Sequence, residues 1–319
     1  MIEPAEFTLK DAYDMYAVGM SFRPLHYAAE TAWSSGAASL PPRLCYYTTG
    51  PTLLSIIEKH AIWSTQVSCV NDSKEIRYAA SVFRDACQER SRREGAAEEE
   101  AILYRELERR LVDEPAVKSR TYIACFSEQE NDLSQWRAYS GGPAGENGYC
   151  IEFDPAGLAE MFRAPGRSVR LVKVEYGKAE HRRWMERIAD LLFSSFMSIY
   201  RYASTTVPLS TWAKDYVTIW ASTLGEVAPQ LKHPDFKNEA EWRLVVSLVE
   251  ENPSELVFQQ RSAMISRHLP LRREPLPIRR VLVGPARHKE VAAESLRLAL
   301  RKHGYTAEVD VSDTPLQAP

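Results

Sequence analysis

The sequence predicts an α+β protein with a mixed or mainly antiparallel central sheet flanked by helices. Short runs rich in β-branched and aromatic residues recur along the chain, such as Tyr122–Phe126 and Trp242–Leu248, and are typical of buried strands. Amphipathic helical patterns lie between such runs, as over residues 53–60 and 288–303. The final strand, helix and strand lack a G-x-G-x-x-G turn, so we interpret them as architecture and not as a dinucleotide site.

The composition is that of a soluble globular protein. The chain has 319 residues, of which 45% are hydrophobic and 26% charged, enough for an ample core. Its net charge of -3 gives no overall electrostatic attraction for nucleic acid. No run of about 18 uncharged apolar residues predicts a membrane span, and the N-terminus lacks the pattern of a secretory signal. We therefore expect a cytoplasmic protein.

The cysteines and histidines show no metal-ligand spacing. The five cysteines, at positions 45, 69, 87, 125 and 150, form no Cys-x-x-Cys pair, which is typical of reduced core residues in the cytosol. The seven histidines form no His-x-x-x-His or comparable pair. We expect neither a disulfide framework nor a bound metal.

The sequence divides into an N-terminal arm and one main domain. Residues 1–42 are predicted to form a helical arm that ends in the linker Ser34–Pro42, and residues 43–315 a single α+β domain. Residues 88–118 are dominated by Glu and Arg at helical spacing, so we expect an exposed helical insertion without chemistry. Strands are expected at 44–48, 61–65, 122–126, 149–153, 169–176, 242–248, 255–258, 264–271, 281–283 and 306–311.

The stretch Lys237–Ser247 contains the main candidate for a functional site. Side chains alternate between the two faces of a strand, so Glu239, Glu241 and Arg243 point the same way if the strand begins that early. Two carboxylates and a guanidinium on one face are costly to bury unless they are paired or used. The alternative is a solvated edge in which Arg243 neutralises Glu241.

Polar and aromatic residues at the ends of other predicted strands are further candidates. Tyr46 and Thr48, two apart on the first strand, share a face, and Tyr47 points the other way. Ser127 directly follows a buried strand. Two aromatic residues on one face of the next helix could line a pocket wall: Trp136 and Tyr139. For all of these, ordinary packing is the competing interpretation.

The helix start near position 71 has two interpretations. Asn71 or Asp72 can cap the helix that carries Glu75. If Asp72 and Glu75 instead converge with Glu239 and Glu241, the four acidic groups could hold Mg²⁺ or Mn²⁺.

Several short motifs follow one another in a fixed order along the chain. They are Tyr46-Tyr47-Thr48, Ile62-Trp63-Ser64, Asn71-Asp72-x-x-Glu75, Cys125-Phe126-Ser127, Trp136-x-x-Tyr139, Gly148–Phe153, Glu239-x-Glu241-Trp242-Arg243 and Val283-Gly284-Pro285. Taken together they resemble the bacterial family catalogued as domain of unknown function 2971, over roughly residues 44–315. The family name implies no established activity. The N-terminal arm, the charged insertion and the glycine loop at 140–148 depart from the family pattern.

A more distant resemblance is to mono-ADP-ribosyltransferases. These also begin with a strand bearing a polar residue and Thr, then a helix and a second strand, as over Leu44–Thr65, and a later strand starts with Glu-x-Glu. The chain differs in having Tyr46 where many of them have His or Arg. The resemblance implies a split sheet of the ADP-ribosyltransferase type, NAD as substrate, and Glu241 and Glu239 as catalytic residues. The cofactor-binding residues that it implies are Tyr46, Tyr47, Thr48, Ser64, Asn71, Ser127, Trp136, Tyr139 and Arg243.

Two carboxylates on one strand face suit the chemistry of ADP-ribose transfer. The reaction breaks a glycosidic bond through an oxocarbenium-like state, which a carboxylate beside the ribose stabilises. On this hypothesis Glu241 holds the ribose hydroxyl and the cation, and Glu239 positions the acceptor. Arg243 or Lys237 then holds a phosphate.

We therefore expect an NAD-dependent mono-ADP-ribosyltransferase-like protein of the bacterial toxin or phage-defence kind. Its acceptor would be a protein or nucleic acid, no membrane partner is expected, and the oligomeric state is left open. The alternatives are a metal-dependent nuclease and a non-catalytic partner-binding module. A cleft shared by Tyr46, Thr48, Glu239 and Glu241 favours the transferase. A cleft with Asp72 and Glu75 but without Tyr46 favours the metal enzyme, and no shared cleft favours the binding module.

Overall fold

Ten strands in the described part of the chain form one sheet. The computed structural model describes residues 40–70, 73–113, 120–139, 148–161, 167–203, 208–214, 216–217, 227–261 and 264–315. The strands are β1 (Leu44–Thr49), β2 (Ala61–Gln66), β3 (Thr121–Ser127), β4 (Gly148–Phe153), β5 (Arg167–Lys173), β6 (Glu241–Leu248), β7 (Val257–Arg261), β8 (Met264–Arg272), β9 (Ile278–Val283) and β10 (Glu308–Val311). Their order is β10-β9-β4-β1-β3-β2-β8-β7, and β6 pairs with both β3 and β5.

The sheet is mixed but mostly antiparallel. The pair β9 and β10 is parallel, whereas neighbours such as β1 and β4, β3 and β6, and β5 and β6 are antiparallel. Helices pack against it, so the predicted fold class is confirmed: a mixed, mainly antiparallel sheet flanked by helices. The split-sheet arrangement of the ADP-ribosyltransferase type stays a prediction.

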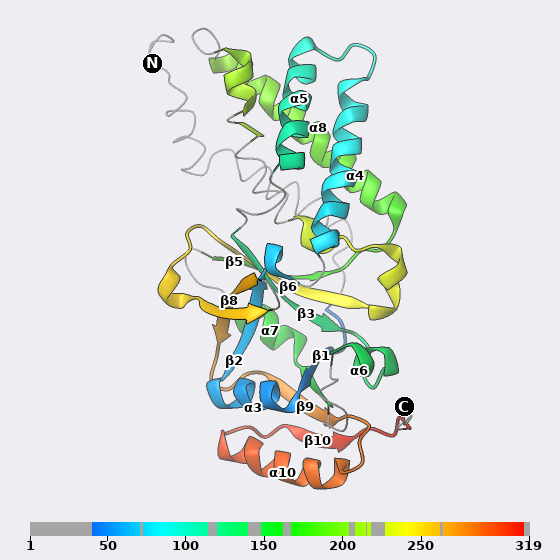
Figure 1. Ribbon diagram of the computed structural model, residues 1–319, viewed down its shortest axis with the longest axis vertical. Helices are drawn as coiled ribbons and strands as arrows, with labels where there is room; N and C mark the ends of the chain where they lie inside the picture. Colours follow the sequence, from blue (N-terminus) through cyan, green and yellow to red (C-terminus); the bar gives the residue numbers. More distant parts are fainter. Residues whose placement is uncertain are drawn as a thin grey trace. The chain divides into compact units, whose positions relative to one another are not determined.

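The chain divides into two compact units. The sheet unit is built from Ser39–Val70, Arg120–Val174 and Asp235–Pro319, and the helical unit from Asn71–Ser119 and Glu175–Pro234. Figure 1 shows strands of the sheet unit with the helices α3 (Gly50–Lys59), α6 (Leu133–Tyr139), α7 (Pro155–Met161) and α10 (Lys289–Lys302). The chain also forms the short 3-10 helices η1 (Val67–Cys69), η3 (Pro234–Glu239) and η4 (Pro253–Glu255). The helical unit holds α4 (Ser73–Ser91), α5 (Glu98–Asp113), α8 (Lys178–Ala203) and η2 (Ala228–Gln230).

The two units can be compared with the predicted arm and the predicted domain. The predicted α+β domain, residues 43–315, spans both units. The predicted arm, residues 1–42, falls almost wholly outside the described residues, which begin at Leu40. The glycine loop predicted at 140–148 lies outside them as well, apart from Gly148.

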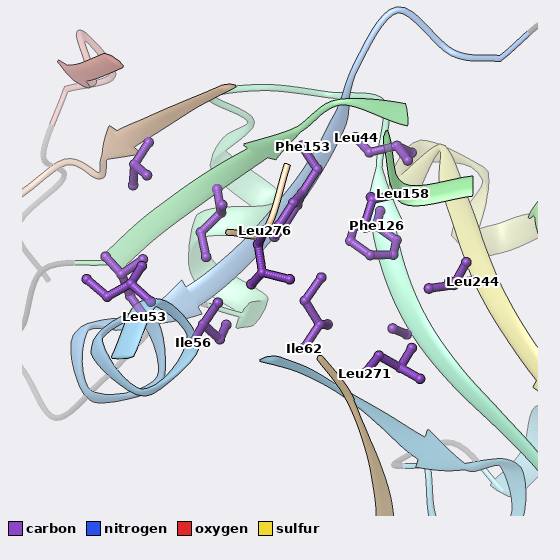
Figure 2. Packing of buried hydrophobic residues seen from close by; sticks show 14 of the residues in the cluster. Leu44, Leu53, Ile56, Ile62, Phe126, Phe153, Leu158, Leu244, Leu271 and Leu276 are labelled. Atoms are coloured by element: carbon purple, nitrogen blue, oxygen red, sulfur yellow. The ribbon is translucent and has the colours of Figure 1, made fainter. Parts of the chain in front are cut away.

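One face of the sheet carries the apolar core of the sheet unit. Figure 2 shows Leu53 and Ile56 from α3 and Leu158 from α7 gathered with strand residues such as Ile62 and Phe126. Residues of α10 belong to the same core. Each fully buried side chain of this size stabilises the fold by about 1.5–3 kcal/mol, so this cluster is a main source of the unit's stability.

Helix α3 forms and ends as its sequence predicts. Pro51 stands in the first turn, where its missing N–H leaves no hydrogen bond unmade. Leu53, Ile56 and Ile57 recur at helical spacing and are all buried against the sheet. The helix stops at His60, whose left-handed conformation (φ 46°, ψ 44°) turns the chain into β2.

The helical unit has a hydrophobic core of its own. α4 packs against both α8 and α5, and the buried residues include Phe83, Cys87, Phe193 and Phe196. Leu103 and Leu107, one turn apart on α5, are buried in this core. The charged segment predicted at 88–118 thus has an inward apolar face, and the expectation of a purely exposed insertion is wrong for α5.

The helical unit leaves and rejoins the sheet between neighbouring strands. The chain departs after β2, forms α4 and α5, and returns to β3, which is antiparallel to β2. It departs again after β5, forms α8, and returns to β6, which is antiparallel to β5. Both segments therefore occupy the place of a hairpin connection.

No helix in the described ranges combines the length and the apolar character needed to cross a membrane.

Candidate functional site

The sheet face opposite the apolar core carries several polar side chains on its central strands, interleaved with the buried apolar residues Ile123 and Val245. In β6, Trp242, Leu244 and Val246 belong to the apolar core. Strand side chains alternate, so Glu241 and Arg243 lie on the opposite face. This places two charged residues on an inner strand, which pairs with β3 on one side and β5 on the other.

Neighbouring strands present further polar side chains on the same side. We name these residues the polar face: Thr65, Thr121, Cys125, Ser127, Glu241, Arg243, Ser247, Ser266 and His268. Several of them satisfy one another, because the Thr121 hydroxyl lies 3.4 Å from that of Ser247 and the Thr65 hydroxyl 3.1 Å from Nδ1 of His268. Buried polar groups cost free energy unless paired in this way. Cys125 is exposed, so solvent reaches the polar face at β3.

Glu241 and Arg243 form a buried ion pair at the start of β6. Their residues are 6% and 2% exposed. Arg243 donates from Nε to one carboxylate oxygen and from Nη2 to the other, each at 2.9 Å. This two-point geometry fixes the orientation of both side chains. The sequence alternative was half right: Arg243 neutralises Glu241, but the pair is buried on an inner strand and not at a solvated edge.

The end of β3 fixes the backbone just before Glu241 and the side chain of Trp242 just after it. Ser127 Oγ donates to the backbone oxygen of Glu239 at 2.7 Å, and the backbone N–H of Glu128 donates to the oxygen of Ala240 at 3.0 Å. The indole N–H of Trp242 donates to Oε1 of Glu128 at 2.5 Å. These contacts explain why the Cys-Phe-Ser and Glu-x-Glu-Trp-Arg motifs occur together.

Glu239 is not on the strand, which corrects one expectation. It ends the turn η3, and β6 begins only at Glu241. Ala240 between them has a positive φ of 44°, which breaks the alternation that would align the two carboxylates. Tyr139 donates from its hydroxyl to Glu239 Oε1 at 3.3 Å, so these two predicted residues meet beside the strand.

Tyr46, Thr48 and Ser64 lie on the apolar side of the sheet. Tyr46 packs against the apolar core, with its ring 5.9 Å from that of Phe126. Thr48 has the same strand parity as Tyr46 and is buried. Ser64 is fully buried and donates to the backbone oxygen of Leu269 at 2.9 Å. The face that carries Tyr46 and Thr48 is therefore not the face that carries Glu241.

Tyr47 and Trp136 lie on the polar side but serve packing there. Their rings meet edge to face at 4.8 Å. The Tyr47 hydroxyl donates to the backbone oxygen of Gln129 at 2.8 Å and accepts from the N–H of Asp132 at 3.1 Å. Burial raises the pKa of Tyr47 well above its usual value, which keeps the phenol neutral.

Gly284 allows Trp136 to pack closely against the sheet. A Cβ atom at position 284 would lie 2.9 Å from the backbone oxygen of Gly148 and 2.9 Å from Cζ3 of Trp136. Gly284 also donates from its N–H to that Gly148 oxygen at 2.8 Å. Three of the ordered motifs thus meet in one packing contact, which gives them a structural role.

Glu128 carries the clearest electrostatic signature near the site. Partial burial tends to raise its pKa, but hydrogen bonds from Lys173 Nζ, at 2.9 Å, and from Trp242 outweigh that effect and lower the pKa. Lys173 also lies over the Trp242 ring, 5.8 Å from its centre. The carboxylate of Glu128 is therefore ionised and binds the Trp242 side chain near the start of β6.

The remaining sequence candidates concern the helix start and a metal. Asn71 and Asp72 lie outside the described residues. Glu75 forms an ion pair with Lys232 at 3.1 Å inside the helical unit. Among the residues that the structure describes, no group of three or more His, Cys, Asp or Glu side chains is placed to hold a metal ion.

Sequence reasoning missed several members of the polar face. Cys125 was assigned to the core with the other cysteines, yet it is exposed. Ser266 and His268 are fully buried and hydrogen-bonded to each other at 2.7 Å, but neither was singled out. The sequence could have indicated them, because Ser266 and His268 are two residues apart in a predicted strand and their side chains therefore share one face.

The fold and site define a mixed α/β protein whose sheet carries its apolar core on one face and, on the other, a group of polar side chains that includes a buried Glu–Arg pair. Residues 135–244 match the model of a family described as "Protein of unknown function (DUF2971)", so the resemblance to that family is confirmed over this stretch. The matched residues include Trp136, Tyr139 and the start of β6. Comparison with curated proteins and with solved structures gave no significant match.

Proposed function

We propose that the protein is an NAD-dependent mono-ADP-ribosyltransferase with Glu241 as its catalytic carboxylate. In this reaction the bond between C1′ of the ribose and the nicotinamide nitrogen breaks, and nicotinamide leaves as a neutral molecule. The acceptor nucleophile forms a new bond to C1′ and releases its proton to a base or to solvent. Glu241 would stabilise the positive charge that develops on the ribose between these two events.

A single observation carries the proposal: Glu241 is a buried carboxylate on the polar face of an inner strand. Buried carboxylates are rare unless they are paired or functional. A fixed carboxylate in a partly desolvated place stabilises a developing cation better than a mobile one in water. The exposed Cys125 is paired in register with Arg243, so solvent reaches the sheet next to the Glu–Arg pair.

The proposal changes which residues would hold NAD. Tyr46, Thr48 and Ser64 lie on the other side of the sheet, so they take no part in it. Tyr139 and Glu239, which meet beside the start of β6, are the remaining predicted residues near Glu241 with an accessible position. The acceptor is an unidentified protein or nucleic acid, and no metal is required by this chemistry.

The test is turnover of labelled NAD by the purified protein, alone and with cell lysate. We expect release of nicotinamide and labelling of a macromolecule by the wild type, and a loss of about 10²-fold or more in Glu241→Gln, as for removal of a main transition-state contact. Glu251→Gln is the matched control, because Glu251 also pairs with an arginine, Arg267, at 3.1 Å, away from the site. Wild-type protein that neither consumes NAD nor labels any acceptor would refute the proposal.

A folding control is needed for this variant. Removing one partner of a buried ion pair costs about 3–5 kcal/mol, because it leaves the other charge unpaired. The double variant Glu241→Gln with Arg243→Met removes both charges, and it should recover much of the lost stability without recovering turnover. Thermal unfolding measured beside turnover therefore separates a catalytic loss from a loss of fold.

A second candidate is a non-catalytic partner-binding module. It is favoured because Tyr46 and Thr48 lie on the opposite face of the sheet from Glu241, so these residues share no cleft. A further observation also favours it. Both oxygens of Glu241 accept from Arg243, and the hydroxyls of Ser127 and Tyr47 bond to backbone oxygens, so each supports the fold. Calorimetric titration with NAD distinguishes the candidates, because a binding module of this kind gives no heat with NAD. Protection of Cys125 from alkylation by NAD would contradict the module and support the transferase.

A further inference from the structure

We propose that Arg243 is a positioning residue that holds the Glu241 carboxylate for the reaction, and that it is not a phosphate ligand. This inference rests on the proposed function and assigns a role within the same site. The guanidinium is 2% exposed. Two of its donors already point to the two oxygens of one carboxylate, each at 2.9 Å.

The geometry of the pair explains why the arginine acts through Glu241. A planar guanidinium matches a carboxylate at two points, which removes the freedom of the carboxylate to rotate. Residues two apart on a strand share a face, so the backbone of β6 sets their separation before any ligand binds. The carboxylate is therefore oriented in advance, and the cost of ordering it is not incurred during the reaction.

The surroundings of the pair fix its place in the sheet. Arg243 is paired in register with Cys125 of β3 and with Val172 of β5, and Glu241 is paired with Ser127. Ser127 and Glu128 in turn bind the backbone at residues 239 and 240. The arginine thus completes a rigid frame around Glu241, built from two neighbouring strands.

A phosphate ligand would make a different demand on Arg243. The guanidinium is 2% exposed and already bonds to Glu241 through Nε and Nη2, so it would have to become accessible before a phosphate could reach it. Positioning keeps the observed contacts unchanged. The two roles predict different kinetics, because a phosphate contact acts on NAD affinity and a positioning contact acts on turnover.

The experiment compares Arg243→Lys with the wild type. Lysine keeps the charge but has no planar fork, so it cannot fix the orientation of the carboxylate at two points as arginine does. We expect kcat for NAD consumption to fall by about tenfold or more, while the Kd for NAD, measured by titration calorimetry, changes by less than about threefold. Arg267→Lys, at the ion pair with Glu251, is the matched control and should change neither quantity.

The pH profile gives a readout that a merely structural role would not move. A neighbouring guanidinium favours the ionised form of a carboxylate. The acidic limb of the kcat profile should therefore shift to higher pH in Arg243→Met. If Arg243→Met does not fold, Arg243→Lys should show a smaller shift in the same direction.

The possible results separate the two proposals. A fall in kcat with NAD affinity unchanged and a shifted acidic limb supports positioning. Weaker NAD binding in Arg243→Lys with kcat and pH profile unchanged overturns it and makes Arg243 a phosphate ligand. Unchanged kcat and unchanged affinity overturn it too. Absence of NAD consumption by the folded wild type overturns the proposed function itself, and with it any role of Arg243 in that reaction.

Discussion

At the scale of single residues, Gly284 shows how little space some motif positions leave. Its missing side chain lets the Gly148 backbone and the Trp136 ring approach from two sides. The Gly148 neighbour is backbone. The Trp136 side chain is held in place by the Tyr47 ring and by a hydrogen bond from its indole N–H to Asn131 Oδ1 at 3.1 Å. Neither neighbour can move away at low cost.

We predict that Gly284→Ala destabilises the protein by about 1–3 kcal/mol, the usual cost of forcing an extra carbon into a packed site. The new Cβ would lie 2.9 Å from both a backbone oxygen and a ring carbon. The measurement is the midpoint of urea unfolding. Gly50→Ala is the matched control, because its nearest contact is a Tyr149 ring carbon at 3.3 Å, and it should cost clearly less. Equal midpoints for the two variants would contradict the prediction.

The candidate site could be predicted from the sequence only in part. Glu241 and Arg243 were recognised because charged residues two apart in an apolar strand must share a face. Glu239 was wrongly placed on that face. The strand begins only after Ala240, whose positive φ interrupts the extended chain, and an alanine in the sequence does not predict a positive φ. Tyr46 was predicted to lie at the site, but it lies on the opposite face of the sheet. The alternation of side chains in β1 shows which residues share a face, but not which face meets the core.

At the scale of secondary structure elements, a buried histidine joins two helices of the helical unit. His181 of α8 is fully buried. Its Nε2 lies 2.7 Å from the backbone oxygen of Glu175, which can only accept, so Nε2 carries the proton. Nδ1 then accepts from the hydroxyl of Tyr78 on α4 at 2.8 Å. The neutral imidazole therefore links α4 to the start of α8.

We predict that stability falls as the pH drops below about 6.5, the pKa of an unfolded histidine. Burial lowers the pKa of His181, so below 6.5 the unfolded chain binds a proton that the folded chain refuses. The stability is fully present above the unfolded pKa and is lost as the pH falls towards the folded pKa. Urea unfolding between pH 7 and pH 5 measures this loss of stability.

The matched variants isolate this histidine. His181→Asn should flatten the pH dependence of stability over that range and should lower stability at pH 7. His288→Asn, at an exposed position before α10, should leave the pH dependence as it is in the wild type. A His181→Asn profile parallel to that of the wild type would assign the pH effect to other groups.

Elements were easier to predict than their packing. The strands and helices were predicted near their observed positions because turn residues and hydrophobic periodicity act locally. The inward face of α5 was missed, since Leu103 and Leu107 stand among many charges and only the tertiary core gives them a partner. The pairing of β6 with β3 and β5 is likewise set by contacts distant in sequence.

At the scale of the whole molecule, the family match does not coincide with either unit. Residues 135–244 contain β4, β5, α8 and the first half of β6. The partners of β4, which are β1 and β9, and the partner β3 of β6 lie outside the match. The matched stretch therefore contains strands without most of their hydrogen-bonding neighbours.

We predict that a fragment of residues 135–244 does not fold by itself. Its strands would leave unpaired edges and its share of the apolar core would be exposed. Circular dichroism and amide proton dispersion should show a largely unfolded chain at concentrations where the full-length protein is folded. A cooperative thermal transition in the fragment would show that the matched stretch is an autonomous domain.

The connections between β2 and β3 and between β5 and β6 can change in length during evolution. Each segment of the helical unit starts and finishes beside paired strands, so its length leaves the strand pairing untouched. Chain-closure entropy rises only with the logarithm of loop length, about 0.6 kcal/mol for each doubling. The strand pairing of the sheet can therefore be kept while residues are inserted, deleted or replaced in these two connections. Relatives that share the strand motifs should differ most in length there.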